Sequence, residues 1–337
     1  MAANEIQHTQ TVRGVVTPAF IKNGSFFFIN LPVYENGIVD CWEAVDLSLL
    51  QEKLRQGWLR SSVPDGAAIS IHGLGDWPVS QGQWFLDQDG LFQRVLSIVR
   101  DLNPDMRNLH DCHGETTQVI EGTRVAVLGT WSGTPVRSEK PRSISGRRFK
   151  GASRSIWLRS NEVTYLADLR VFADGKVELG RVPEPEVWTL EQLEEAAREG
   201  RLLTCPQRGE RVAIDGLGSF AVGDPNWTVD LPEMLAEVLD LVESANGRPD
   251  SLARCRLAFD EYMEAPSVER REVLKVAYEA IPEHNRIFVG DMDTKDIPVR
   301  MIIYGDGEVE NWSHRLVAKS QGLPLPTITV PRPPEEK

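Results

Sequence analysis

The sequence has no apolar run that could cross a membrane: the longest runs, such as residues 26–29, hold a handful of residues, whereas a transmembrane helix needs about 20. Residues 1–11 are polar and lack the charged and apolar blocks of an export signal. Cysteine is scarce, and none of the four cysteines forms a CxxC pair: they are Cys41, Cys112, Cys205 and Cys255. These absences predict a reduced, cytoplasmic protein without disulfides and without a membrane partner.

Positive charge is also in short supply. Thirty-seven Lys and Arg residues face 50 Asp and Glu residues, which gives a formal net charge of −13. Such a surface repels phosphate backbones, so nucleic acid is not expected as a partner. The basic stretch 137–150 departs from this pattern, but it is rich in Ser, Gly and Pro and is predicted to lie in a solvated linker, residues 132–150. A nucleic-acid-binding arm is the alternative for this stretch.

Familiar catalytic motifs are missing as well. The sequence contains no Gly-x-x-x-x-Gly-Lys-Ser/Thr phosphate loop, no Gly-x-Ser-x-Gly nucleophile turn and no His-Glu-x-x-His zinc motif. The Gly73-Leu74-Gly75 turn is followed by Asp76, Trp77 and Pro78, so it does not match a dinucleotide-binding turn. No cofactor is therefore expected, and an enzyme is not the favoured class.

What the sequence does contain is an internal repeat. Residues 19–42 predict three apolar segments joined by two turns, and residues 155–180 repeat this scheme at an offset of 138. Asn36-Gly37 and Asp174-Gly175 predict the second turn of each copy as a hairpin turn. The match resumes at an offset of 143, and between residues 46–104 and 189–247 it holds 18 identities in 59 ungapped positions. This predicts two copies of one module.

Each copy continues with a helix, a strand, a Gly-Leu-Gly turn and a second helix. Gly57 and Gly200 are predicted to end the first helix of each copy in the left-handed conformation. In the second copy, Thr189 with Gln192 and Asp230 with Glu233 are predicted to cap the two helices.

The predicted fold class is α+β, with tandem duplicated modules of an antiparallel three-stranded meander plus helices on one face. The modules are expected at residues 13–131 and 151–247. Residues 248–321 are expected to hold a helical pair and a third, partial meander at residues 286–312. The tail, residues 322–337, holds five prolines and is predicted to be extended or disordered.

Two groups of residues could hold a metal ion. His110, Cys112 and His113 are zinc-ligand types, but no second close cluster completes the set, so an ordinary polar loop is favoured and no metal is expected. The second group is an acidic cluster, which would suit a metal-dependent hydrolase because carboxylates hold divalent cations: Asp291, Asp293, Asp296, Glu310 and His314. Lys295 lies inside this cluster and would weaken cation binding. A solvated acidic face is the favoured interpretation.

The remaining candidates form a binding surface. Trp58 and Trp77 are predicted surface anchors, because their repeat counterparts are Arg201 and Phe220; Glu308, Glu310 and Trp312 are predicted to share one face of the third meander. His72 and His284 are predicted to be structural histidines and not general bases. The leading prediction is a non-catalytic acidic protein that binds a basic protein partner, for example a bacterial immunity or inhibitor protein of a basic nuclease. The metal-dependent hydrolase is the alternative.

Overall fold

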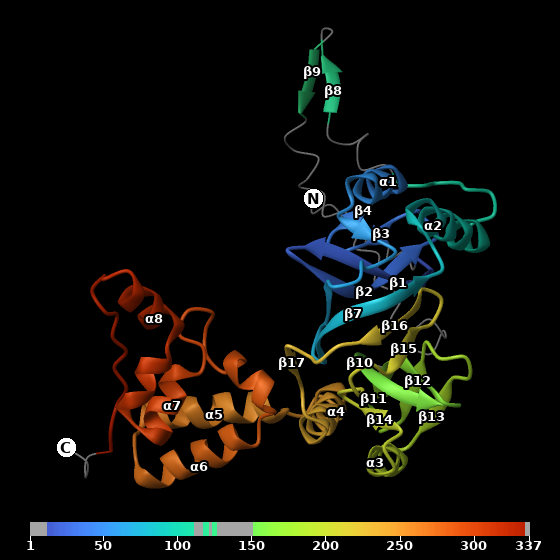
Figure 1. Cartoon of the computed structure of the whole chain (residues 1–337). Coiled ribbons are helices and arrows are strands. Elements are labelled where there is room, and N and C mark those ends of the chain that lie inside the picture. Colours follow the sequence, from blue (N-terminus) through green and yellow to red (C-terminus); the bar gives the residue numbers. More distant parts are fainter. Residues whose placement is uncertain (1–11, 111–116, 121–122, 127–150, 334–337) are drawn as a thin grey trace, which may run out of the picture. The chain divides into compact units, whose positions relative to one another are not determined.

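The computed structural model describes residues 12–110, 117–120, 123–126 and 151–333, which fall into two compact units (Figure 1). Unit 1 comprises Met1–Arg170 and Lys176–Thr228, and unit 2 comprises Val171–Gly175 and Val229–Lys337. Unit 1 combines helices with a mixed sheet, so the predicted α+β class is confirmed. Between residues 229 and 333 every regular element is helical.

The first module of unit 1 begins as the predicted meander and then becomes a mixed sheet. Its strand β6 runs parallel to β2, and β7 runs antiparallel to β6. Helices α1 and α2 cover one face of this sheet, where Leu50, Leu54 and Val95 are buried against the strands. The elements are β1 (Gly14–Asn23), β2 (Ser25–Tyr34), β3 (Val39–Asp40), β4 (Ala44–Val45), α1 (Leu47–Gln56), β5 (Leu59–Arg60), β6 (Ala68–Ile71), β7 (Gly75–Trp84) and α2 (Gln88–Leu102).

The second module repeats this order. A separate hairpin, β8 (Thr117–Ile120) with β9 (Thr123–Ala126), precedes it. The elements of the second module are β10 (Gly151–Ser160), β11 (Val163–Phe172), β12 (Val177–Gly180), β13 (Glu186–Trp188), α3 (Leu190–Arg198), β14 (Leu202–Leu203), β15 (Arg211–Ile214), β16 (Gly218–Val222) and β17 (Trp227–Thr228).

The strand pairing of the two modules has the same register. Phe26 lies opposite Ile69 in the parallel contact of β2 with β6, and Thr164 lies opposite Val212 in the parallel contact of β11 with β15. These pairs are equivalent at the offsets of 138 and 143 seen in the sequence. The β6–β7 and β15–β16 hairpins also pair at equivalent residues. The sequence repeat is therefore matched residue by residue in the sheet.

Strands β7 and β16 join the two modules into one 15-stranded sheet (Figure 1). Val79 lies opposite Val222, its own counterpart in the repeat, so the two modules meet about an approximate twofold axis. Aromatic rings pack across this junction: the buried Trp77 lies edge-on to the buried Trp157 at 5.6 Å, and the half-buried Trp84 stacks on the buried Phe220 at 5.8 Å. Burial of rings this large makes the junction a hydrophobic core shared by both modules.

The Gly-Leu-Gly motif is explained by this junction. Gly73 and Gly216 have φ of +71° and +72°, which suits the tight turn that the sequence predicts. The second glycine serves a different purpose. A Cβ on Gly75 would lie 2.7 Å from the carbonyl oxygen of Trp227, and one on Gly218 would lie 2.3 Å from that of Gln83. Each second glycine therefore leaves room for the strand of the other module.

The helix ends follow the predicted signals with one exception. Thr189 and Gln192 form the predicted capping box, and Gly57 ends α1 with φ of +73°. Asp230 stands at the N-cap of α4 (Leu231–Ala245), but its side chain accepts no hydrogen bond there. The carboxylate of Glu233 instead accepts a hydrogen bond from the backbone N–H of Glu283. The predicted cap of α4 is therefore wrong.

Unit 2 is built around one helical core in which Tyr262, Leu274 and Ile302 are buried. It includes α4, so the boundary between the compact units precedes the predicted module boundary at residue 247. The elements after α4 are α5 (Ser251–Glu264), α6 (Val268–Glu279), the 3-10 helix η2 (Glu283–Phe288), α7 (Ile297–Tyr304), the 3-10 helix η3 (Asp306–Asn311) and α8 (Ser313–Ser320).

The predicted third meander is wrong, because every regular element between residues 283 and 320 is helical. Residues 297, 299 and 301 are all apolar and buried, so their alternation imitates a strand. Ile302 is buried as well, because α7 is surrounded by the core and has no single apolar face. Pro298 in the first turn is compatible with a helix, where its missing N–H costs nothing.

The tail is extended and ordered as far as residue 333, so the prediction of disorder is wrong for that part. Val330 is buried in the core of unit 2. The carbonyl of Pro331 accepts a hydrogen bond from the Tyr262 hydroxyl at 3.0 Å, and that of Pro326 accepts one from Arg315 at 2.9 Å. Apolar side chains between the prolines therefore anchor the segment.

Candidate functional site

The acidic cluster predicted around residue 291 is dispersed in the structure. Asp291 accepts hydrogen bonds from the backbone N–H groups of Thr294 and Asp293 at 2.6 and 3.0 Å, which hold its pKa below the ordinary value. Asp296 is buried and accepts a hydrogen bond from the Tyr278 hydroxyl at 2.6 Å. Burial, followed by this hydrogen bond, raises the pKa of Tyr278.

Glu308 of the predicted binding surface and Glu310 of the cluster also have other partners. Glu308 pairs with Arg300, and Glu310 pairs with Arg315 at 2.8 Å. The His314 ring lies edge-on to Trp312 at 5.4 Å. Within the described ranges of the chain, no three His, Cys, Asp or Glu side chains are grouped so that they could hold a metal ion. The geometry thus gives the hydrolase alternative no support.

Two predicted anchors are not on the surface. Trp77 is fully buried in the junction of the modules, and Trp312 is buried with its indole N–H donating to the carbonyl of Asp293 at 2.8 Å. Their assignment to a binding surface is therefore wrong. Trp58 is half-buried beneath the Lys53 amine, which lies 4.2 Å from its ring centre. The neighbouring Trp42, which the prediction omitted, is 56% exposed.

Other candidates lie partly outside the described residues. Cys112, His113 and the basic stretch 137–150 belong there. His110 is described, and its backbone N–H donates to the carbonyl of Asn36 at 2.8 Å. His284 contacts the buried Glu237 carboxylate at 3.2 Å. No helix in the part of the chain that the structure describes is long and apolar enough to cross a bilayer.

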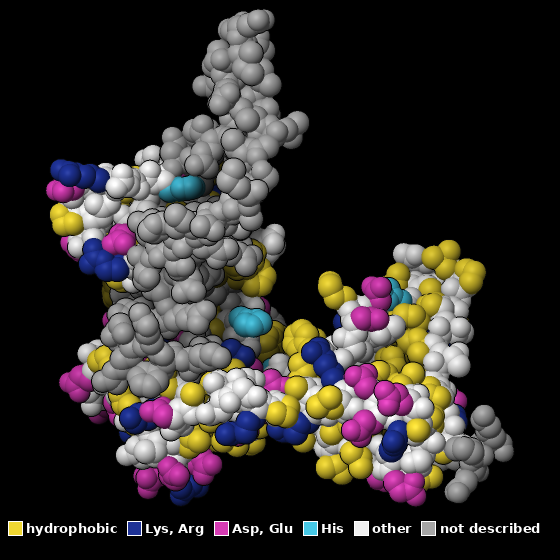
Figure 2. Space-filling model, turned by 180° about the vertical axis from the view of Figure 1, so that it is seen from behind, with side chains coloured by type: hydrophobic (Ala, Val, Ile, Leu, Met, Phe, Trp, Pro, Cys, Tyr) yellow, Lys and Arg dark blue, Asp and Glu magenta, His cyan; other side chains and the backbone are white. Residues whose placement is uncertain are grey.

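The surface of unit 2 carries most of the large apolar side chains that are exposed among the described residues. In Figure 2, hydrophobic and acidic side chains lie next to one another over this unit. They are Leu239, Leu257, Met263, Val273, Val276, Ile287, Phe288, Met292, Tyr304, Leu316, Val317, Leu323 and Leu325. Exposed apolar groups of this density are typical of interaction surfaces.

Helix α6 shows the clearest pattern within that surface. Its buried face is formed by Leu274 and Tyr278, which belong to the core of unit 2. The opposite face is exposed and holds residues spaced by three or four positions, so they form one row along the helix. We call this row the α6 stripe; it consists of Glu269, Glu272, Val273, Val276 and Ala280.

The α6 stripe combines two valines with two carboxylates. Val273 is 55% exposed and Val276 is 69% exposed. Hydrogen bonds from its own backbone N–H and from the Ser267 hydroxyl hold the pKa of Glu269 below its ordinary value, so that carboxylate is ionised at neutral pH. Helix α5, which packs beside α6, similarly exposes Leu257 near acidic residues. The sequence indicated an acidic binding surface but not these valines, because the pattern at residues 267–280 predicts a helix without showing which of its faces stays exposed.

Comparisons with known proteins give a family but no activity. A family model described as "Domain of unknown function (DUF7638)" matches residues 2–106 and again residues 139–249. A second model, "Domain of unknown function (DUF7639)", matches residues 250–322. No curated protein and no solved structure shows a significant match.

Proposed function

We propose that this chain, which belongs to the domain family of unknown function DUF7638, is a non-catalytic protein built from two copies of one module and that it binds a protein partner through unit 2. The observation that carries the proposal is the α6 stripe. It presents Val273 and Val276 beside two carboxylates on an exposed helix face.

The composition of the stripe is costly for the fold itself. Valine is a poorer helix former than alanine by about 0.5 kcal/mol, and an exposed valine recovers little of this through packing. Residues that break a local rule without benefit to the fold are expected at functional positions. Because the stripe presents carboxylates beside the valines, its partner should carry Lys or Arg next to apolar side chains.

The net charge agrees with a partner of that kind. At −13, the chain attracts a basic protein over distances set by the ionic strength, and complementary charge raises the association rate. A basic nuclease has this chemistry, and in that case the chain would act as its inhibitor. The prediction of a basic protein partner is therefore retained as part of the proposal.

The test uses the full-length chain as bait in an extract of the native host. The Val273→Ala/Val276→Ala variant should capture the specific partner at least about tenfold less well, although its helix should be as stable as before or slightly more stable. Val187→Ala is the matched control, since Val187 is 62% exposed but lies on β13 of unit 1.

Two readouts distinguish binding from a structural role. Capture should fall as salt is raised, whereas the thermal midpoint of the double variant should stay at or above that of the unaltered chain. A large loss of stability would mean that the valines support the fold. A captured protein that is retained equally by both variants would show that the stripe is not the binding surface.

A further inference from the structure

The short turn between β3 and β4 places a tryptophan on the surface of unit 1. Residues 41–43 form this turn, and the backbone N–H of Cys41 donates across it to the carbonyl of Glu43 at 2.9 Å. Trp42 stands at its centre and is 56% exposed. Its φ is +67°, in the left-handed region that glycine adopts at low cost and a bulky side chain rarely enters. A strained and exposed tryptophan is a candidate for a functional contact.

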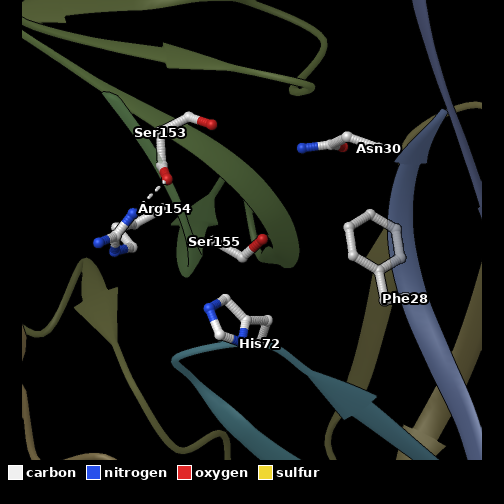
Figure 3. A pocket seen from close by; sticks show the side chains of 6 residues that line it. All are labelled: Phe28, Asn30, His72, Ser153, Arg154 and Ser155. Carbon is white, nitrogen blue, oxygen red and sulfur yellow. Dashed lines mark hydrogen bonds between the residues drawn. The ribbon is translucent and has the colours of Figure 1, made fainter. Parts of the chain in front are cut away.

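Two further aromatic rings contact Trp42. The centre of the Phe27 ring lies 5.4 Å from that of Trp42, and the Trp58 ring lies 6.2 Å away and nearly perpendicular. Phe27 projects from one face of β2; its neighbour Phe28 projects from the other face and lines a small hollow together with His72 (Figure 3). Ring contacts therefore hold the Trp42 side chain, although more than half of the residue is open to solvent.

This group of rings already holds one cation of the chain itself. The Lys53 amine lies 4.2 Å from the centre of the Trp58 ring, and it also pairs with the Glu43 carboxylate. The ring attracts the cation through its quadrupole, and the carboxylate attracts it through its charge. Phe27 and Trp58 are half-buried, so the ring of this group that remains accessible to an external cation is that of Trp42.

The second module contains the same chemistry in other residues. Glu186 corresponds to Glu43 at the offset of 143, and it pairs with Arg201 at 2.9 Å. The Arg201 guanidinium lies 5.0 Å from the centre of the Trp188 ring. Here the cation comes from the position that Trp58 has in the first module. Each module thus places a cation beside an indole and beside the equivalent carboxylate, although the residues that supply the cation and the ring differ.

We propose that the exposed ring of Trp42 receives an arginine side chain of the basic partner, with the guanidinium stacked on the indole. Arginine suits this place better than lysine, because its planar guanidinium stacks on aromatic rings and is more weakly hydrated. The net charge of −13 attracts such a partner, and the adjacent Glu43 side chain is 61% exposed. The inference rests on the proposed basic partner, and it adds a contact on unit 1 to that of the α6 stripe in unit 2.

The probe is a hexa-arginine peptide, which is titrated into the full-length chain while the indole N–H signals are observed by NMR. The signals of Trp42 and Trp58 are identified by their loss in Trp42→Phe and Trp58→Phe. We expect saturable shifts of the Trp42 signal. The Trp58 signal should shift as well, because its ring lies 6.2 Å from that of Trp42, and it reports on binding when Trp42 is replaced. No shift of the Trp42 signal would overturn the proposal.

Trp42→Phe and Trp42→Leu form a matched pair of variants. Both keep the net charge and an apolar side chain at the left-handed position, but only phenylalanine keeps a ring. The dissociation constant read from the Trp58 signal should rise about two- to fivefold in Trp42→Leu and less in Trp42→Phe. Equal dissociation constants for the two variants would show that the ring does not bind the cation and would overturn the assignment.

The Val273→Ala/Val276→Ala variant separates this contact from the α6 stripe. It should bind hexa-arginine at Trp42 with an unchanged dissociation constant, because the replaced valines lie in unit 2. A loss of the Trp42 shifts in this variant would contradict a separate contact on unit 1. Failure of the peptide titration leaves the capture experiment on the stripe unaffected, so the two proposals can fail independently.

Discussion

The contact between the two modules can be tested with a single added methyl group. In Gly218→Ala the new Cβ would lie 2.3 Å from the carbonyl oxygen of Gln83 and 2.9 Å from the ring of Trp84. Because this oxygen belongs to the backbone of β7, strands β7 and β16 must move apart to make room for the methyl group. Overpacking of this kind costs about 1–3 kcal/mol, and each weakened hydrogen bond between the strands adds about 1 kcal/mol. We expect Gly218→Ala to lower the free energy of unfolding of unit 1 by about 2–4 kcal/mol.

Urea unfolding followed by tryptophan fluorescence measures that loss, and hydrogen exchange locates it. Exchange should rise in residues 75–84, which lie in the other module. Gly209→Ala is the matched control, because Gly209 has φ of +79° but no atom within 4 Å of the added Cβ. Its cost should be about 1–2 kcal/mol without faster exchange in β7. Unchanged exchange of β7 in Gly218→Ala would refute the reasoning.

Three further predictions follow from single contacts. Thr189→Ala should destabilise the chain by about 1 kcal/mol in a thermal melt because it removes a capping box, whereas Asp230→Ala should cost less, since Asp230 accepts no capping bond; equal losses would contradict this. Tyr278→Phe should cost about 1.5–3 kcal/mol, because it leaves the buried Asp296 carboxylate without its donor. Since the folded-state pKa of Tyr278 is raised, its contribution to stability should hold below about pH 10 and fall as the pH rises further, which a series of melts at alkaline pH measures. Burial raises the pKa of Cys41 and Cys255 to about 11, so N-ethylmaleimide at pH 8 should modify the exposed Cys205 faster than either, as read by peptide mass spectrometry; equal rates would contradict the burial.

Local signals in the sequence predicted the hairpin turns of the two modules and most helix ends correctly, although they failed for the third meander. Asn36-Gly37 and Thr189 with Gln192 encode their structures within a few residues, so they can be recognised without the rest of the fold. The repeat also indicated which distant strands are equivalent. The structure agrees, because the parallel pair of β2 with β6 and that of β11 with β15 are related by the two offsets of the repeat.

Features that depend on the surroundings were not predictable. Residues 297–304 are apolar on several sides, so their pattern does not distinguish a strand from a buried helix. Trp77 was assigned to the surface because its counterpart is Phe220, yet both rings are buried at the junction. The hollow between β2, β10 and the turn after β6 carries no sequence motif, because these three segments meet only in the folded chain.

The pairing of β7 with β16 has a consequence for any shortened form of the protein. A fragment that ends after the first module would expose the open edge of β7 together with the aromatic surface around Trp77. Two such fragments could pair through their β7 edges, since Val79 and Val222, which lie opposite one another in the whole chain, occupy the same place in the repeat. The chain thus resembles a dimer whose two subunits are covalently linked. Single-module fragments should therefore form such a dimer rather than a stable monomer.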